Sequence, residues 1–334
     1  MATKYAAITG WSSVVPSRVL TNFDLEKFVD TTDEWITTRT GIRERHVVGQ
    51  DETTSTLAIQ AARQALERAE IPPSRVDLVI CCTATPDYLF PATACLVQNE
   101  IGAEKAGAFD LQAACSGFIY GLAVGTQFVN TGAYNTVLVV AAEALSRFID
   151  WQDRSTCVLF GDGAGAVVLR PSDKPAGLLS FVLGSYGAGE DLIKLPAGGA
   201  RFPASEATLA ERKHYIKMNG KETYRFAVRI LGDSAIEALD KAGLAYKDIS
   251  LFIPHQANTR IIDSVAKRLE LDPAKVYIDI DKYGNTSAAS IPIALCEAID
   301  EGKVRPGDNL LFVAFGAGLT SAAAVLKWGG EASL

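Results

Sequence analysis

The chain has 334 residues, of which 48% are hydrophobic and 21% are charged, with a formal net charge of −7 and a pI of about 5.2. This composition fits one large or two medium globular domains, and the acidic balance excludes a global basic field for nucleic acid. The N-terminal stretch MATKYAAITG turns polar by Trp11, and no apolar run reaches membrane-spanning length, so we expect a cytoplasmic protein without a membrane segment.

Apolar strand-like runs alternate with amphipathic helical stretches along the chain, which predicts an α/β fold. In chain order, we expect helices at 56–69, 116–130, 223–242, 259–269 and 291–301, and strands at 76–82, 136–140, 164–169, 251–253, 276–278, 310–315 and 322–326. The strands are rich in Val, Ile and Leu with little alternation, which indicates burial on both faces. Residues 171–180 predict a connector, and the Gly-, Ala- and Pro-rich stretch 184–212 predicts an excursion over the surface or near a site.

Three segments of the first half recur in the second half at one offset of 173 residues. DLVICC at 77–82 matches SLFIPH at 250–255, NTVLVVAAE at 135–143 matches DNLLFVAFG at 308–316, and the helical stretch 56–70 matches 229–243. Each similarity is weak, and any two βα units resemble one another to some degree. Because the three offsets agree in chain order, we interpret them as a duplicated α/β unit whose two sheets pack together, with halves at 1–174 and 175–334.

The six cysteines form no CxxC pair and lie mostly in apolar runs, so we expect neither a zinc site nor a disulfide framework. Five of them (Cys81, Cys82, Cys95, Cys157 and Cys296) are interpreted as small buried hydrophobes. Cys115 differs, because it follows the small residues Ala113 and Ala114 and precedes an apolar helix. A helix N-terminus lowers the pKa of a thiol, and a thiolate is the nucleophile of thioester chemistry. The alternative, an inert cysteine in a small-residue packing site, stays open at this point.

His255 and Asn285 are two further candidates. Of the three histidines, His46 and His214 lie in charged stretches and are predicted to be solvated, whereas His255 directly follows an apolar strand that ends at Pro254. The ends of strands in open α/β sheets are where ligands bind, although a capping or packing histidine is the alternative. Asn285 lies in a Gly-Asn-Thr-Ser turn before a small-residue helix start, and by itself it is interpreted as a turn residue.

Taken together, these segments resemble the β-ketoacyl-[acyl-carrier-protein] synthase III family over nearly the whole chain. The resemblance is carried by TNFDLEKFVDTTDEWITTRTGIRERH at 21–46, AACSGF at 113–118, FGDGAGA at 160–166, PHQAN at 254–258, YGNTSAAS at 283–290 and FGAGLT at 315–320. It implies a thiolase-like, five-layered αβαβα fold made from two duplicated halves, usually as a homodimer. The set of Cys, His and Asn separates this family from thiolases, which use a second Cys, and from elongating synthases, which use two His.

The resemblance also implies an activity, the condensation of an acyl-CoA primer such as acetyl-CoA with malonyl-[acyl-carrier protein]. The products would be a 3-oxoacyl-[acyl-carrier protein], CO2 and CoA, at the start of fatty acid biosynthesis. Cys115 would carry the acyl group, and His255 and Asn285 would donate hydrogen bonds to the malonyl thioester oxygen. The backbone N–H groups of Cys115 and Ala317 would hold a second oxyanion, although many members have Gly at the latter position. No metal and no separate cofactor is implied, since the coenzyme A thioester is a substrate.

Further site residues follow from the same resemblance. Trp35 and Arg154 would sandwich the adenine of coenzyme A, Arg39 would lie near its phosphates, and Asn258 would contact its pantetheine arm. Phe90 would reach the acyl pocket of the partner subunit. A basic patch for the acidic carrier protein would consist of Arg225, Arg260, Lys267 and Arg268.

Several alternatives remain beside this interpretation. Close relatives of the same fold prime polyketides or transfer acyl groups to other acceptors. A non-catalytic thiolase-fold scaffold would be expected to lack Cys115, His255 or Asn285, and all three are present. A structural protein with an inert Cys115 is the remaining alternative. The sequence does not specify the primer, because its chain length and branching depend on the shape of a pocket.

Overall fold

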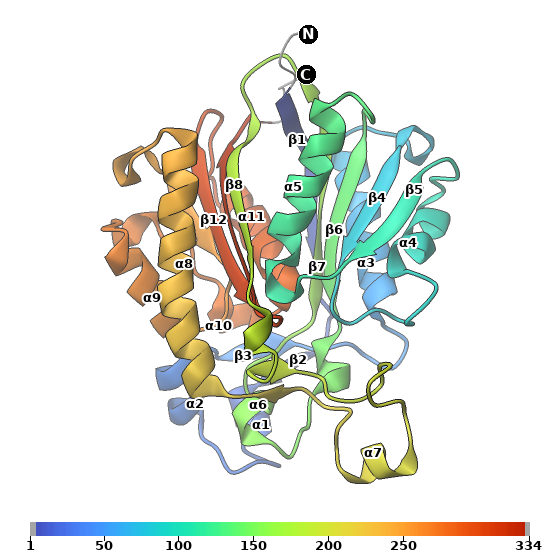
Figure 1. Cartoon of the computed structure of the whole chain (residues 1–334), viewed down its shortest axis with the longest axis vertical. Helices are drawn as coiled ribbons and strands as arrows, with labels where there is room; N and C mark the ends of the chain where they lie inside the picture. Colours follow the sequence, from blue (N-terminus) through green and yellow to red (C-terminus); the bar gives the residue numbers. More distant parts are fainter. Residues whose placement is uncertain (1–4, 331–334) are drawn as a thin grey trace.

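The computed structural model describes residues 5–330, which form two large β-sheets and two small ones (Figure 1). The first large sheet has the order β1-β7-β6-β4-β5, and the second has the order β11-β12-β13-β8. Their strands are β1 (Tyr5–Val14), β4 (Leu78–Cys82), β5 (Gly107–Leu111), β6 (Val137–Glu143) and β7 (Gly163–Ser172), then β8 (Gly177–Ser185), β11 (Leu251–Pro254), β12 (Asn309–Gly316) and β13 (Thr320–Lys327). The small sheets pair β2 (Val19–Thr21) with β3 (Glu44–His46) and β9 (Ile193–Lys194) with β10 (Lys217–Met218).

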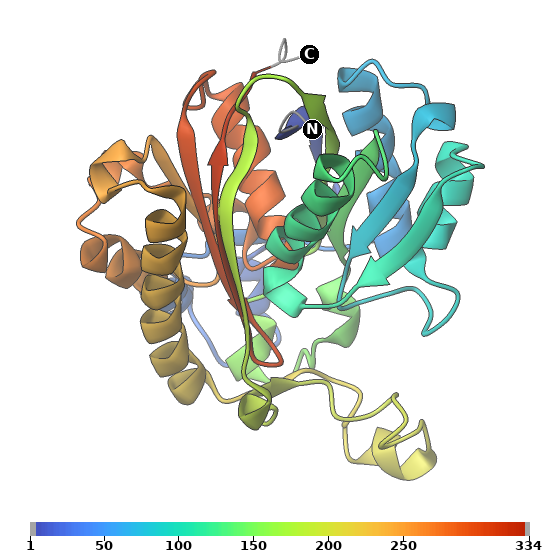
Figure 2. The ribbon, with the colours of Figure 1, turned by 45° about the horizontal axis from the view of Figure 1, so that its top comes forward.

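The helices complete five layers, as the resemblance implied. Two central helices, α5 (Gly117–Asn130) and α11 (Ser290–Asp300), lie between the sheets (Figures 1 and 2). The outer face of the first sheet is covered by α3 (Thr54–Arg68) and α4 (Thr93–Ile101), and that of the second by α8 (Gly220–Ala242) and α9 (Thr259–Arg268). The short helices are α1 (Asn22–Leu25), α2 (Asp33–Thr40), α6 (Arg154–Cys157), α7 (Glu206–Ala210) and α10 (Ile280–Tyr283).

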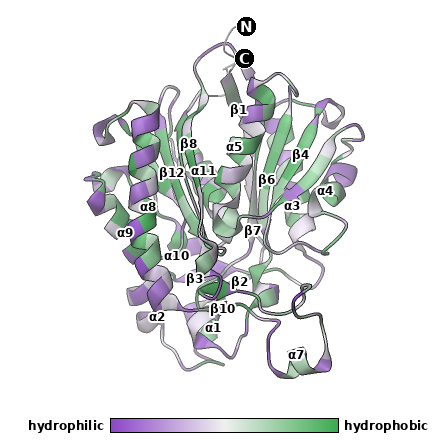
Figure 3. Ribbon diagram, viewed as in Figure 1, coloured by the Kyte–Doolittle hydropathy of each residue, from purple (hydrophilic) through white to green (hydrophobic). Residues whose placement is uncertain are grey.

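The hydropathy of each helix matches its layer. Figure 3 shows α5 and α11 largely apolar and α8 and α9 with a hydrophilic outer face. A helix that is apolar all round is buried, whereas a surface helix buries one stripe. Gly121 allows α5 to lie directly on the first sheet, because a Cβ there would be 2.4 Å from the Cys82 sulfur. The distribution of apolar residues around each helix therefore indicates whether the helix lies in the central layer or in an outer layer.

The two large sheets repeat one pattern of strand directions. In the first, β4 and β6 are parallel and β7 and β1 follow antiparallel; in the second, β11 and β12 are parallel and β13 and β8 follow antiparallel. The segments that share the 173-residue offset occupy equivalent strands, β4 with β11 and β6 with β12. The division at 174/175 stays a prediction; it falls in the 173–176 link between β7 and β8.

Two elements differ from the sequence prediction. The expected strand at 276–278 is wrong, because only Val276 pairs, in a single parallel bridge with Phe252 beside β11. A 3-10 turn at Pro273–Lys275 and the start of α10 at Ile280 leave too few residues there for a ladder. The expected connector at 171–180 is also too long, since β7 extends to Ser172 and β8 begins at Gly177. Among residues 5–330, no helix is long and apolar enough to cross a membrane.

Candidate active site

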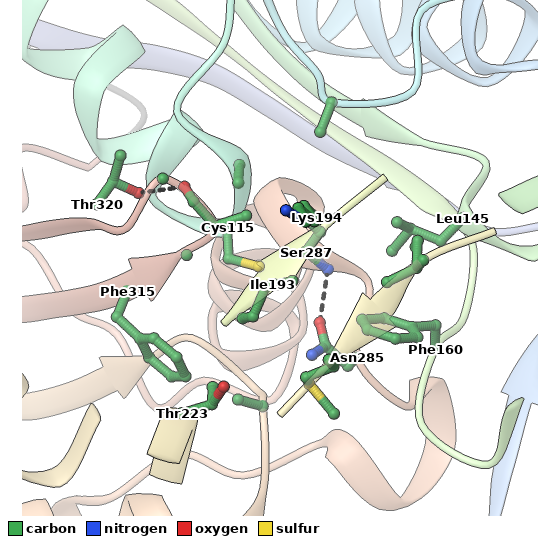
Figure 4. A pocket seen from close by; sticks show the side chains of 18 of the residues that line it. Cys115, Leu145, Phe160, Ile193, Lys194, Thr223, Asn285, Ser287, Phe315 and Thr320 are labelled. Carbon is green, nitrogen blue, oxygen red and sulfur yellow. Dashed lines mark hydrogen bonds between the residues drawn. The ribbon is translucent and has the colours of Figure 1, made fainter. Parts of the chain in front are cut away.

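Side chains from both halves line one pocket of about 640 Å³ at the carboxyl ends of the parallel strands. Cys115, His255 and Asn285 all belong to its wall, so the structure brings together the three residues that the sequence predicted as partners. Figure 4 shows Cys115 and Asn285 directed toward the same cavity. Ligands in open α/β folds bind at this edge of the sheet.

Cys115 lies in a 3-10 turn (Ala114–Ser116) that connects β5 to α5, as the sequence predicted for a residue at a helix start. The end of β12 passes against this turn, because a Cβ added to Gly316 would lie 2.6 Å from the Cys115 nitrogen. Thr320 fixes the contact by donating from Oγ1 to the carbonyl of Ala113 at 2.8 Å. The backbone of Ala317 is thereby held beside Cys115 in the pocket wall.

Burial raises the pKa of the Cys115 thiol to about 12, so the lowered pKa predicted from the helix start is wrong for the free thiol. The rise corresponds to about 4 kcal/mol against the thiolate. A hydrogen bond with the Ser287 side chain opposes this rise, and the charge of Glu143 adds to it. A helix N-terminus contributes only about 0.3–1 kcal/mol at an exposed site, so desolvation dominates.

His255 follows the last residue of β11, and its N–H donates to the carbonyl of Val313 at 2.8 Å, which extends the pairing with β12. The residue is 4% exposed, and its Nδ1 lies 2.7 Å from the Ser290 hydroxyl oxygen. Burial lowers the pKa of His255 to about 3. The imidazole is therefore uncharged at neutral pH.

Asn285 is held in the turn between α10 and the 3-10 turn Ser287–Ala289. Its N–H donates to the carbonyl of Leu159 at 2.9 Å, and its carbonyl accepts from the N–H of Gly161 at 3.0 Å. The side-chain Oδ1 accepts from the N–H of Ser287 at 2.9 Å, as the dashed line in Figure 4 shows. Because this bond occupies the acceptor, the Nδ2 amino group is the donor that Asn285 offers to the pocket.

Trp35 on α2 has two guanidinium groups over its ring. The Cζ of Arg39 lies 4.6 Å and that of Arg154 4.9 Å from the ring centroid. Asn258 connects this cluster to the pocket, because it lines the pocket and its Nδ2 donates to the carbonyl of Arg39 at 2.9 Å. The structure thus brings together all four residues that the resemblance implied for coenzyme A.

The remaining implied residues lie on the surface. Phe90 is 85% exposed in the loop between β4 and α4, beside the exposed Tyr88 and Leu89. The four basic residues are exposed on the neighbouring helices α8 and α9. Arg225 pairs with Glu222 and Arg268 pairs with Asp233, whereas within residues 5–330 Arg260 and Lys267 form no ion pair.

Three residues outside the predicted site differ from expectation. Cys95 on α4 is exposed rather than a buried hydrophobe, because it lies beside the edge strand β5, where its Sγ is 4.0 Å from the carbonyl oxygen of Ala108. His46 and His214 are half-buried rather than solvated. The Nδ1 of His46 lies 2.5 Å from the carbonyl oxygen of Pro16, and the Nε2 of His214 lies 2.9 Å from the Thr208 hydroxyl. All six cysteines are free thiols.

Three polar residues of the site were not anticipated from the sequence. Ser287 and Ser290 hold Asn285 and His255, and Glu143 accepts a hydrogen bond from the Ser287 hydroxyl. Both serines lie in the YGNTSAAS run at 283–290, and the glutamate ends an apolar strand in VLVVAAE. A carboxylate at the end of a buried strand is the signal that could have pointed to Glu143.

The architecture and pocket define a thiolase-like acyltransferase. Residues 109–187 match the family described as 3-Oxoacyl-[acyl-carrier-protein (ACP)] synthase III, and residues 239–328 match its C-terminal part. The beta-ketoacyl-[acyl-carrier-protein] synthase III of Roseiflexus sp. (strain RS-1) is 57% identical over 324 residues, 97% of this chain and 98% of that protein.

Two solved structures extend the comparison. The 3-oxoacyl-[acyl-carrier-protein] synthase III from Aquifex aeolicus VF5 is 49% identical with a TM-score of 0.90, over 97% of this chain and 100% of that one. The priming β-ketosynthase from the R1128 polyketide biosynthetic pathway is 38% identical with a TM-score of 0.91, over 98% and 97%. The chain belongs to the beta-ketoacyl-[acyl-carrier-protein] synthase III family.

Proposed function

We propose that this protein condenses an acyl-CoA primer with malonyl-[acyl-carrier protein] to a 3-oxoacyl-[acyl-carrier protein], CO2 and CoA, and so initiates fatty acid biosynthesis. The observation that carries the proposal is the convergence of Cys115, His255 and Asn285 on one pocket. A nucleophile and two hydrogen-bond donors are what an acyl transfer followed by decarboxylation requires.

In the first half-reaction, Cys115 attacks the thioester carbonyl of the acyl-CoA and takes over the acyl group. The negative charge that develops on the carbonyl oxygen is held by the backbone N–H groups of Cys115 and Ala317, which Gly316 and Thr320 support by closing the two loops on each other. Backbone donors need no reorganisation when the charge appears. A side chain at Ala317 leaves this backbone donor in place.

In the second half-reaction, His255 and Asn285 donate to the thioester oxygen of the malonyl group while CO2 leaves. The proposed mechanism needs the tautomer of the histidine that Ser290 would hold by donating to Nδ1. The Ser290 hydroxyl lies 2.7 Å from Nδ1, and in this mechanism it donates its proton to that nitrogen. The ring proton is then on Nε2, and a neutral imidazole with that proton is a donor toward the pocket. Asn285 supplies the second donor through Nδ2. The resulting carbanion attacks the acyl-Cys115 thioester.

Coenzyme A would bind at the Trp35 cluster. Arg154 lies directly on the indole, with 4.9 Å between its Cζ and the ring centroid. An adenine inserted between the two would need about 7 Å, which is twice the optimal separation of non-bonded carbon atoms. Arg154 would therefore swing away from Trp35 and close on the outer face of the base, while its bond to the carbonyl of Asp30 at 2.7 Å breaks or adjusts.

The carrier protein and a second subunit would bind at two different surfaces. Arg225, Arg260, Lys267 and Arg268 form an exposed basic patch on α8 and α9, although the protein as a whole is acidic, which suits an acidic carrier. A homodimer is supported by the edge strand β5 and by the exposed apolar side chains around Phe90, which would cover one another between two copies. The cytoplasmic location expected from the sequence stays a prediction.

The proposal is tested with labelled acetyl-CoA and malonyl-[acyl-carrier protein]. We expect the label first on Cys115 and then in a β-ketoacyl product on the carrier. Cys115→Ser should lower acyl transfer from CoA by about 10³-fold or more, because an alcohol is a much weaker acid than a thiol and far less of its anion forms at this site. Labelled enzyme without β-ketoacyl product would refute the condensation. An unlabelled wild-type enzyme would refute the acyl-Cys115 intermediate.

The similarity to the R1128 priming ketosynthase supports one second candidate, the priming of a polyketide by the same two half-reactions. A panel of acyl-CoA primers and of carrier proteins from both pathways distinguishes the two. Higher kcat/KM with the fatty acid carrier supports the initiation of fatty acid synthesis. Higher kcat/KM with a polyketide carrier supports the second candidate.

A further inference from the structure

A carboxylate lies behind the nucleophile and has no part in the chemistry described above. Glu143, the last residue of β6, is fully buried. Its Oε2 accepts from the hydroxyl of Thr85 at 2.6 Å and of Thr83 at 3.2 Å, and from the N–H of Ala84 at 3.1 Å, while its Oε1 accepts from the hydroxyl of Ser287 at 2.9 Å. All four donors are uncharged. Burial of a carboxylate without a neighbouring cation lowers the stability of the fold, because the charge loses its hydration. Such a residue is therefore a candidate for a functional role.

Ser287 connects this carboxylate to the nucleophile. Its hydroxyl is 2.9 Å from Glu143 Oε1. The turn that carries Ser287 packs against the turn that carries Cys115, and the Ser287 side chain is hydrogen-bonded with the Cys115 thiol. Figure 4 shows both residues in the wall of the pocket. The residue adopts φ +50°, a conformation that costs a non-glycine residue about 1–3 kcal/mol. A serine is thus held in a strained turn with its hydroxyl between a thiol and a carboxylate.

The nucleophile needs an acceptor for its proton. Burial raises the pKa of Cys115 to about 12 and lowers that of His255 to about 3, and Nδ1 of that histidine is already bonded to Ser290. Transfer of the proton to His255 would create two charges in a desolvated pocket. Transfer to Glu143 creates none, because a single negative charge moves from the carboxylate to the sulfur. Burial also raises the pKa of Glu143, which favours its protonated form.

We propose that Glu143 accepts the thiol proton of Cys115 through the hydroxyl of Ser287 and thereby activates the nucleophile. The inference rests on the proposed function, of which it concerns the first half-reaction. The S–H proton passes to Ser287 Oγ as the serine proton passes to Glu143 Oε1, which leaves a thiolate and a neutral carboxylic acid. The thiolate forms the new C–S bond, and the CoA sulfur leaves with the electron pair of the broken one. The proton returns through Ser287 to the CoA sulfur. The acylation step as a whole therefore takes up no proton from the solvent and releases none to it.

Other titratable groups surround this relay. Cys82 ends β4, His255 lies in the pocket wall, and Asp110 on β5 accepts from the N–H groups of Thr93 and Ala94. Burial raises the pKa of Cys82 and lowers that of His255, so neither changes charge between pH 6 and pH 9. Within this window, the relay gives an acylation rate that does not depend on pH, because the thiol and the carboxylate share one proton. Without it, the rate rises tenfold per pH unit as hydroxide removes the thiol proton.

The test measures single-turnover acylation by labelled acetyl-CoA from pH 6 to pH 9. Glu143→Gln and Ser287→Ala should lower the acylation rate at pH 7 by about 10²-fold or more. The rates of both variants should rise about tenfold per pH unit, whereas the wild-type rate should not depend on pH. Alanine suits position 287, because Ala114 adopts nearly the same backbone angle, φ +47°. Ser180→Ala is the matched control, because Ser180 is a buried serine that bonds the carbonyl of Ala238 and does not line the pocket; its acylation rate should stay within about threefold of wild type and its pH profile should stay flat.

Two results would overturn the relay. One is a flat profile in Glu143→Gln or Ser287→Ala. The other is faster acylation by Glu143→Gln than by wild type at pH 7, which a mere electrostatic neighbour of the thiol would produce. If Glu143→Gln does not fold, as judged by circular dichroism, Ser287→Ala decides. Alkylation of Cys115 by iodoacetamide over the same pH range repeats the comparison without any substrate. The relay can therefore be tested even if wild type makes no β-ketoacyl product and the proposed function fails.

Discussion

The turn that carries Cys115 and the turn that carries Ser287 are equivalent parts of the two halves, and they differ in what they present. At the offset of 173 residues, Ala114 corresponds to Ser287, and both adopt a positive φ, +47° and +50°. Cys115 corresponds to Ala288, which is buried. The same backbone therefore presents a nucleophile in one half and a supporting hydroxyl in the other.

The strand ends show the same division. Cys82 at the end of β4 corresponds to His255 after β11, and Glu143 at the end of β6 corresponds to Gly316 at the end of β12. One half places a carboxylate where the other places a glycine that lets the two turns touch. In each of these pairs one member lines the pocket, His255 and Gly316, and the other, Cys82 and Glu143, is buried behind its wall. Each half therefore fills equivalent positions for a different task. Four changes test this division.

The largest effect is expected for Asn285→Ala, which removes a donor that only the second half supplies. Decarboxylation of malonyl-[acyl-carrier protein] should fall by about 10²–10³-fold, the usual loss for one oxyanion donor, while acylation of Cys115 changes little. Asn285→Asp is the matched variant, because it keeps the acceptor for the Ser287 N–H and removes the Nδ2 donor. The two half-reactions are measured separately with labelled substrates. An equal loss of both would contradict the role of Asn285.

The pH dependence of stability should separate Glu143 from His255. A lowered folded pKa means that the unfolded state binds more protons between pH 6.5 and pH 3, so the contribution of His255 to stability falls as the pH falls. Between pH 6 and pH 4 this loss amounts to about 2–3 kcal/mol. The raised pKa of Glu143 acts in the opposite direction, with stability lost as the pH rises through its folded pKa.

Urea unfolding of wild type and His255→Gln at a series of pH values checks this expectation. The stability advantage of wild type over the variant should shrink by the stated amount on going from pH 6 to pH 4. His214→Gln serves as control, because that ring is half-buried and bonded to Thr208. A pH-independent difference for His255→Gln would show that the ring is already solvated in the folded state.

Gly316→Ala tests the close contact between the halves. The added Cβ would lie 2.6 Å from the Cys115 nitrogen and 3.0 Å from the Ala114 Cβ, so the turn must move. We expect a loss of about 1–3 kcal/mol in the free energy of unfolding, together with slower acylation. Gly199→Ala is the control, since a Cβ there has nothing within 4 Å. Equal stability of both variants would contradict the tight contact.

The smallest effect is expected at the basic patch. Arg260→Glu combined with Lys267→Glu should raise the KM for malonyl-[acyl-carrier protein] about 3–10-fold at low salt, and less at high salt. Acylation by acyl-CoA should change less than this. Lys241→Glu, an exposed position on α8 paired with Glu237, is the control. The same increase in KM for the control would show that only the net charge of the protein matters.

The sequence by itself determined the positions of most of the long helices and buried strands and the repeat at 173 residues, and it predicted Cys115, His255 and Asn285 as site residues. Strands and helices follow from local apolar patterns, which neighbouring residues encode. The local patterns around Cys115 and His255 left a packing role open, and Asn285 by itself was interpreted as a turn residue. The three were predicted as partners only through the resemblance to a family, which combines motifs from the whole chain. Elements without a strong local pattern, such as β1, were not anticipated, and the expected strand at 276–278 shrank to a single bridge.

Only the tertiary structure decided how the site residues are supported and charged. The bond from Ser287 to Glu143 joins residues 144 apart in the chain, and that between His255 and Ser290 joins residues 35 apart. Local sequence carries no record of such partners. The thiol pKa is the clearest case, because the helix start next to Cys115 favours a thiolate, whereas burial, which the whole fold imposes, opposes it more strongly. Desolvation depends on every layer that surrounds a group, and therefore only the assembled fold determines it.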